Sequence, residues 1–140
     1  MMEHNKKCKD KVANSLASRM EDLEMLWGAY CNGEEETEIG SFNEYGLCFD
    51  YVSAGTFDDQ DEGYFRYQLS YGGPTEEFRF YCDPTLECYK IEFWYLDWFD
   101  GAHKVLRGDN QKLMLEIYEY FNEVGTTAYL LEEAREEGYG

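Results

Sequence analysis

The stretch over residues 64–98, YFRYQLSYGGPTEEFRFYCDPTLECYKIEFWYLDW, decides the fold of this chain. Within it, apolar and aromatic side chains alternate with polar ones in three runs, which is the period of half-buried β-strands. The runs cover 64–71, 77–82 and 89–98. Two turn sequences, GGPT and DPT, separate them. Strands joined by such short turns pair antiparallel with their neighbours in the chain, so this stretch predicts a meander.

Upstream of the meander, the sequence predicts one helix and one more strand. Apolar residues recur at spacings of three and four over 12–31, and the Asn-Gly pair that follows is a typical helix end. These apolar positions are Leu16, Met20, Leu23, Trp27 and Tyr30. Residues 46–52 (GLCFDYV) are expected to form the first strand, and an acidic connection over 53–63 leads into the meander. The sheet is therefore expected to have four strands.

Downstream of the meander, the sheet is expected to end at the Asp-Gly pair 100–101, and helices are expected to follow. Asp109 is a suitable N-cap for a helix over 110–124. The apolar stripe of this helix is expected at Leu113, Ile117, Tyr120 or Phe121, and Val124. A last short helix, rich in glutamate, is expected through Ala134.

Taken together, these elements predict a single α+β domain over 12–140. It consists of an N-terminal helix, a four-stranded antiparallel sheet and one or two C-terminal helices. Residues 1–11 are expected to be a flexible basic tail. One face of the sheet is expected to pack under the helices, whereas the other face is unusually aromatic for a solvated surface.

The chain is strongly acidic, since 30 acidic residues face 12 basic ones, for a formal net charge of −18. Five of the basic residues lie in the first 19 positions, so residues 20–140 carry 7 basic against 28 acidic residues. Such self-repulsion destabilises a compact state, and solubility alone needs a net charge of only about 2–8 in a small domain. A halophilic origin would also give an acidic surface, but the many large aromatic residues and the cysteines argue against it. We therefore interpret the acidity as functional.

The five cysteines, an odd number without a CxxC pair, are expected to be free thiols in a reducing compartment. Cys82 and Cys88 could lie close across a turn. The sequence shows no signal peptide and no apolar run of membrane-spanning length. We therefore expect a cytoplasmic protein. Its oligomeric state is left open, a dimer included.

No constellation of residues predicts catalysis, a metal site or a cofactor. Asp58, Gln60 and Glu62 resemble the start of a calcium-binding EF-hand loop, but its twelfth position is Leu69, where a glutamate is required. His103 follows a strand end and has no plausible cysteine or serine partner. Neither a zinc motif nor a phosphate-binding glycine loop with its lysine is present. We expect no enzyme activity, and a carboxylate-based hydrolase is the distant alternative.

The residues expected to bind a partner are carboxylates of the acidic connection, of one turn and of the C-terminal helices. They are Asp58, Asp59, Asp61, Glu62, Glu76, Glu77, Glu116, Glu119, Glu123, Glu132 and Glu133, followed by Glu136 and Glu137. Glu116, Glu119 and Glu123 share one helix face because their spacing is i, i+3, i+7. Dense carboxylates can imitate the charge of phosphates, and exposed aromatic side chains can anchor the complex. Nucleic acid itself would be repelled, and no membrane partner is expected.

In these features the chain resembles the small acidic proteins of phages and mobile elements that mimic nucleic acid and block host defence, the anti-restriction and anti-CRISPR inhibitors. The segments GYFRYQLSYGGP (63–74), EEFRFY (76–81) and FWYLDWFDGA (93–102) also resemble a recurrent phage or plasmid reading frame. The inhibitor class has no shared motif, so this resemblance assigns no role to individual residues. It implies a basic nucleic-acid-binding partner, a Cas effector or a restriction nuclease, in the cytoplasm of a bacterial host cell. The alternative is an acidic immunity or antitoxin-like protein that neutralises a basic toxin.

Overall fold

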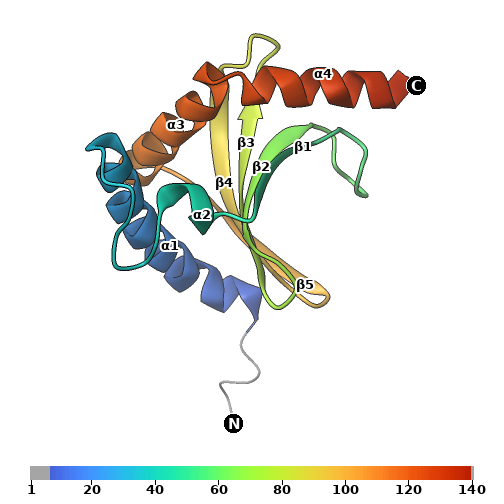
Figure 1. Cartoon of the computed structure of the whole chain (residues 1–140). Coiled ribbons are helices and arrows are strands. Elements are labelled where there is room, and N and C mark those ends of the chain that lie inside the picture. The colour runs from blue at the N-terminus through green and yellow to red at the C-terminus, as the bar shows by residue number, and fades with distance from the viewer. Residues whose placement is uncertain (1–6, 140) are drawn as a thin grey trace.

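The computed structural model describes residues 7–139, which form one antiparallel sheet with helices packed against it (Figure 1). The five strands pair in chain order, β1-β2-β3-β4-β5. The strands are β1 (Cys48–Val52), β2 (Tyr64–Ser70), β3 (Thr75–Cys82), β4 (Cys88–Asp97) and β5 (Asp100–Val105). The helices are α1 (Cys8–Cys31), α2 (Phe42–Tyr45), α3 (Gly108–Glu123) and α4 (Thr126–Tyr139). The predicted α+β order of N-terminal helix, antiparallel sheet and C-terminal helices is confirmed.

The prediction of four strands is wrong by one. β5 pairs with β4 from Glu92↔Val105 to Asp97↔Asp100 and forms an edge of the sheet. Its sequence, DGAHKV, has no apolar alternation, and most of its side chains are exposed. Backbone hydrogen bonds place this strand, so the hydrophobic pattern carries no signal for it.

Helix α1 begins at Cys8, inside the stretch predicted as a flexible tail; residues 1–6 of that stretch lie outside the described part of the chain. The backbone N–H of Cys8 donates to the carboxylate of Asp100 at 2.8 Å. This bond holds the pKa of Asp100 below its usual value. A residue of β5 thus satisfies one free N–H in the first turn of α1. The contact joins distant segments, so the local sequence does not contain it.

The C-terminal helices are longer than predicted. α3 follows Arg107, so Asp109 lies in its first turn instead of capping it. α4 continues beyond Ala134 as far as residue 139. None of the helices within residues 7–139 has the length and the apolar composition that crossing a bilayer requires.

The core lies between the helices and one face of the sheet. The fully buried side chains of this face are Phe65, Phe78, Phe80, Ile91 and Phe93. They share one cluster with Leu23 and Leu26 of α1 and with Met114, Ile117 and Tyr118 of α3. The predicted stripe of α3 includes Ile117 but not Met114 or Tyr118, and Val124 at its end is exposed. The buried stripe of α3 is therefore rotated about the helix axis relative to the predicted stripe. Packing against the neighbouring elements decides which side of the helix is buried.

The other face of the sheet, which we call the open face, alternates aromatic and charged side chains. Tyr64 and Tyr81 form a small buried cluster there with Val52. Arg66 of β2 pairs with Asp50 of β1, with 2.7 Å between Nη2 and Oδ2. Along each strand, the charged and polar side chains of the open face alternate with the apolar side chains of the core face. This is the alternation that the sequence shows.

Candidate partner-binding surface

Three of the predicted carboxylates, Glu116, Glu119 and Glu123, lie together in a groove beside α1. The groove has a volume of about 560 Å³, and Trp27 and Tyr120 also line it. We call it the α3 groove. The indole Nε1 of Trp27 donates to Oε1 of Glu116 at 3.4 Å. The shared helix face predicted for the three glutamates is therefore a wall of a groove that also has aromatic residues.

Beneath the α3 groove lies an aromatic cluster that joins α1 to α3. The ring of Tyr30 lies 5.5 Å from that of Trp27 and 5.4 Å from that of Tyr120, measured between centroids. The hydroxyl groups of Tyr30 and Tyr120 are hydrogen-bonded at 3.2 Å. Phe42 of α2 completes the cluster, with its ring centroid 5.5 Å from that of Tyr30. Such packed rings hold the floor of the groove in one arrangement.

A second group of carboxylates, absent from the predicted site, borders the same aromatic cluster. Glu34, Glu35 and Glu36 are exposed and line a hollow with Tyr30 and Phe42. The run of three glutamates directly after a predicted helix end was the available signal. Contacts of Tyr30 and Phe42 with Tyr120, which join segments far apart in the sequence, place this loop near α3.

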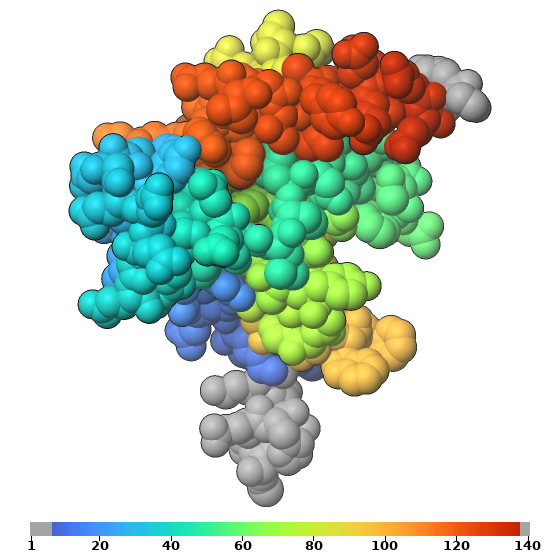
Figure 2. Space-filling view, viewed as in Figure 1, coloured from blue at the N-terminus to red at the C-terminus, as the bar shows by residue number. Residues whose placement is uncertain are grey.

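Helix α4 extends the acidity of α3. The two helices follow one another along one edge of the molecule (Figure 2). Glu132 and Glu133 are exposed, as are Glu136 and Glu137. The hydroxyl of Tyr129 donates to Oε2 of Glu133 at 2.8 Å. No carboxylate of α3 or α4 forms an ion pair with any other residue in 7–139.

The acidic connection between β1 and β2 faces a different direction from the α3 groove. Asp58, Asp59, Asp61 and Glu62 line a cavity of about 530 Å³ on the open face of the sheet. The amide of Gln60 shapes the connection, because its Nε2 donates to the carbonyls of residues 53 and 62. Since α3 packs on the opposite face, the predicted carboxylates do not form one continuous surface.

The cavity on the open face contains basic side chains of the chain itself. The guanidinium carbon of Arg79 lies 4.0 Å from the ring centroid of Trp94 and 4.7 Å from that of Tyr64. The ammonium of Lys90 lies 4.3 Å from the ring centroid of Tyr81 and 3.9 Å from Oε2 of Glu62. These two cations offset part of the negative charge of the acidic connection. Among the residues that line the α3 groove, Lys112 is the one basic side chain.

The predicted surface residue Glu77 is buried and unavailable to a partner. Its side chain is 2% exposed, and its Oε2 lies 2.7 Å from Nε of Arg79. The amide of Gln68 donates to its other oxygen at 3.4 Å. A carboxylate needs such partners when it is buried. We therefore assign Glu77 to the internal packing of the open face and not to the binding of a partner. Its i, i+2 spacing to Arg79 on one strand was the sequence signal for this pairing.

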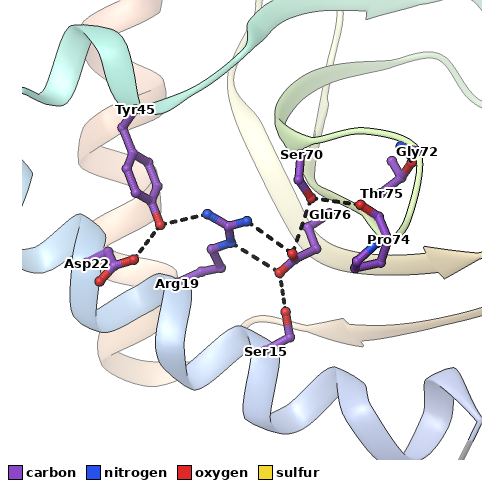
Figure 3. Close-up of polar contacts among 9 residues, drawn as sticks. All are labelled: Ser15, Arg19, Asp22, Tyr45, Ser70, Gly72, Pro74, Thr75 and Glu76. Carbon is purple, nitrogen blue, oxygen red and sulfur yellow. Dashed lines mark hydrogen bonds and ion pairs between the residues drawn. The ribbon is translucent and has the colours of Figure 1, made fainter. Parts of the chain in front are cut away.

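The predicted surface residue Glu76 is also engaged inside the molecule (Figure 3). Arg19 of α1 makes a bidentate contact with its carboxylate, at 3.1 Å from Nε and 3.0 Å from Nη2. The hydroxyl groups of Ser15 and Ser70 donate to the same carboxylate. Burial alone would raise the pKa of Glu76, but the bonds from Arg19 and Ser15 outweigh it and hold the pKa below 4.5, its usual value.

The substitution Glu76→Gln is expected to lower the free energy of unfolding by about 1–3 kcal/mol at about pH 7. The ionised carboxylate stabilises the folded state fully above the unfolded pKa, near 4.5, and this contribution is lost as the pH falls through the lower folded pKa. The difference between wild type and variant should therefore shrink towards about pH 3, as urea denaturation can measure. Glu24→Gln, at an exposed position of α1, is the control. A difference of equal size at both pH values would contradict this account.

The described residues offer little for metal or thiol chemistry. No three His, Cys, Asp or Glu side chains within 7–139 are grouped so that they could hold a metal ion. Leu69, at the position where an EF-hand needs its glutamate, is buried in β2. Cys82 and Cys88 face each other across β3 and β4 as free thiols, and burial raises the pKa of Cys88 to about 12. His103 is exposed and stacks on Trp94, with 4.4 Å between ring centroids.

Comparisons of the chain with protein families, with curated proteins and with solved structures find no match. The geometry and the charge of the described residues are therefore the basis on which a function can be proposed.

Proposed function

We propose that the chain is a binding protein that inhibits a nucleic-acid-binding nuclease of host defence, CRISPR–Cas or restriction, by presenting an acidic surface like that of DNA or RNA. The α3 groove and the exposed glutamates of α4 form that surface. The observation that carries the proposal is the division of charge in the fold: three partly buried arginines are paired with carboxylates, whereas the glutamates of α3 and α4 form no ion pair within residues 7–139.

Three arginines show this division. Arg19, Arg66 and Arg79 each form an ion pair with a carboxylate of the sheet, at 2.7–3.0 Å. Their charges are therefore used inside the molecule and do not offset the glutamates outside. Unpaired exposed carboxylates on one edge create a negative potential that extends into solvent by about one Debye length, roughly 8–10 Å. A basic cleft that normally holds nucleic acid is the complementary surface.

The density of this charge decides what it can do. Helices α3 and α4 carry eight carboxylates against Lys112 and Arg135. Their 16 and 14 residues span together about 45 Å at a rise of about 1.5 Å per residue. One net negative charge per roughly 7–8 Å is about a quarter of the density of duplex DNA, which has one per about 1.7 Å. Such a surface steers association, and further contacts are needed to hold the partner.

Capture from a bacterial lysate that contains these defence systems tests the proposal. Immobilised protein is expected to retain a basic nucleic-acid-binding nuclease at about 50 mM salt and to lose most of it at about 200 mM, since the contacts are largely ionic. A captured toxin encoded beside this protein would instead support the immunity alternative. Recovery of no basic nucleic-acid-binding protein at low salt would refute the proposal.

A further inference from the structure

The turn between β4 and β5 exposes two aromatic side chains completely. The turn consists of Trp98 and Phe99, because Asp97 and Asp100 are the last pair in the register. Trp98 is 89% exposed, and the side chain of Phe99 is exposed in full. The turn protrudes at the lower right of the molecule, beside the turn between β2 and β3 (Figure 2).

The residue type at Trp98 is unfavourable for this turn. Its φ is 55°, in the left-handed region that side chains other than glycine adopt at a cost. A two-residue hairpin turn with a positive φ at its first position favours glycine there. Neither aromatic ring is buried, so neither recovers this cost through the hydrophobic effect. Folding therefore does not explain a Trp-Phe pair at this position.

A third exposed aromatic residue lies at the same end of the sheet. Thr75, at the start of β3, pairs with Leu96 near the end of β4. The turn between β2 and β3, which precedes Thr75, is therefore a neighbour of the turn between β4 and β5, which follows Leu96. Tyr71 in the first of these turns is 77% exposed. We call Tyr71, Trp98 and Phe99 the aromatic tip. Asp97 and Asp100 flank it, and the start of α1, with Lys7 near Asp100, lies beside it, so its border carries charges of both signs.

We propose that the aromatic tip is the anchor that holds the nuclease, by inserting into an apolar pocket of that protein. The inference rests on the proposed function for the nature of this partner. The net charge of −18 favours a basic partner over an anionic membrane or a second copy of the chain. Aromatic side chains that enter a pocket dominate the affinity of many interfaces.

One partner of ordinary size can reach both the aromatic tip and the α3 groove. α1 connects them, because Cys8 bonds to Asp100 beside the tip and Trp27 lines the groove. These two positions of the helix are about 28 Å apart at the α-helical rise. A standard interface covers about 800 Å² on each partner, a patch roughly 30 Å across. The groove and the tip therefore lie near opposite ends of α1, at a separation comparable to the width of one standard interface.

The double substitution Trp98→Gly with Phe99→Ser tests the anchor. The melting temperature is expected to stay the same or to rise by about 2–4 °C, because glycine suits the turn better. Dissociation from the captured nuclease, purified and measured by surface plasmon resonance, is expected to be about 30-fold faster. Leu47→Ser, which also removes an exposed apolar side chain, is the matched control and should leave dissociation unchanged.

Five outcomes would overturn the inference. A clear fall in melting temperature would show that the two rings stabilise the fold. Unchanged dissociation of a captured nuclease would refute the anchor and leave the proposed function standing, whereas capture of no such nuclease would refute both. Loss, in the variant, of wild-type binding to phosphatidylcholine or phosphatidylserine vesicles would assign the tip to a membrane. Loss of a wild-type dimer in sedimentation velocity would assign it to self-association.

Discussion

Replacing Arg79 with alanine is expected to lower the free energy of unfolding by about 3–5 kcal/mol, the range found when one partner of a buried ion pair is removed. Glu77 would remain buried without the guanidinium that lies 2.7 Å from its carboxylate. The rings of Tyr64 and Trp94 would also lose the cation that lies over both of them. Denaturation in urea, followed by circular dichroism, measures the change.

The matched control is Arg66→Ala, on the neighbouring strand of the same face. Its ion pair with Asp50 is more exposed, with side chains 24% and 38% accessible, against 13% and 2% for Arg79 and Glu77. Since solvent screens such a pair, a loss of about 1 kcal/mol or less is expected. Equal losses of stability in the two variants would contradict the burial of Glu77 and would indicate that its carboxylate is accessible to solvent.

Charge reversal in the α3 groove is expected to slow association with the nuclease by about 10–100-fold at low salt, within the range that electrostatic steering supplies. The variant replaces Glu116, Glu119 and Glu123 with lysine, so a basic cleft would meet a basic groove. The three side chains are exposed, and the melting temperature should change much less than the association rate. Stopped-flow or surface plasmon resonance with the purified nuclease measures the rate.

The matched comparison changes Asp58, Asp59 and Asp61 to lysine, which alters the net charge of the chain by the same amount. These residues lie on the other side of the sheet, beside the chain's own Arg79 and Lys90. The association rate should therefore fall less than in the groove variant, and the two rates should converge at high salt as screening increases. Equal slowing would assign the effect to net charge alone, and greater slowing would place the interface on the acidic connection.

The meander over 64–98 was predictable because its evidence is local. Alternation defines each of these strands, and short turns between them leave antiparallel pairing as the simple solution. β5 was missed because its side chains are exposed and its pairing depends on the backbone. The start of α1 was missed because Asp100, far away in sequence, accepts the hydrogen bond from Cys8.

The candidate surface was predictable only in part. The i, i+3, i+7 spacing placed Glu116, Glu119 and Glu123 on one face correctly, since helix geometry fixes it. Burial of Glu76 was not predictable, because its partner Arg19 comes from a helix 57 positions away. The separation of the acidic connection from α3 depends on which face of the sheet each one covers, and composition does not contain that information.

If the acidic surface occupies the site of nucleic acid on a nuclease, this protein and duplex DNA compete for the nuclease captured at low salt. A competition experiment with the purified nuclease tests this exclusion. We expect DNA to displace the protein to the extent set by the affinity of the nuclease for DNA. We also expect the protein to block cleavage of DNA by the nuclease. A ternary complex, in which the nuclease binds DNA and this protein together with unchanged affinities, would contradict the proposed exclusion.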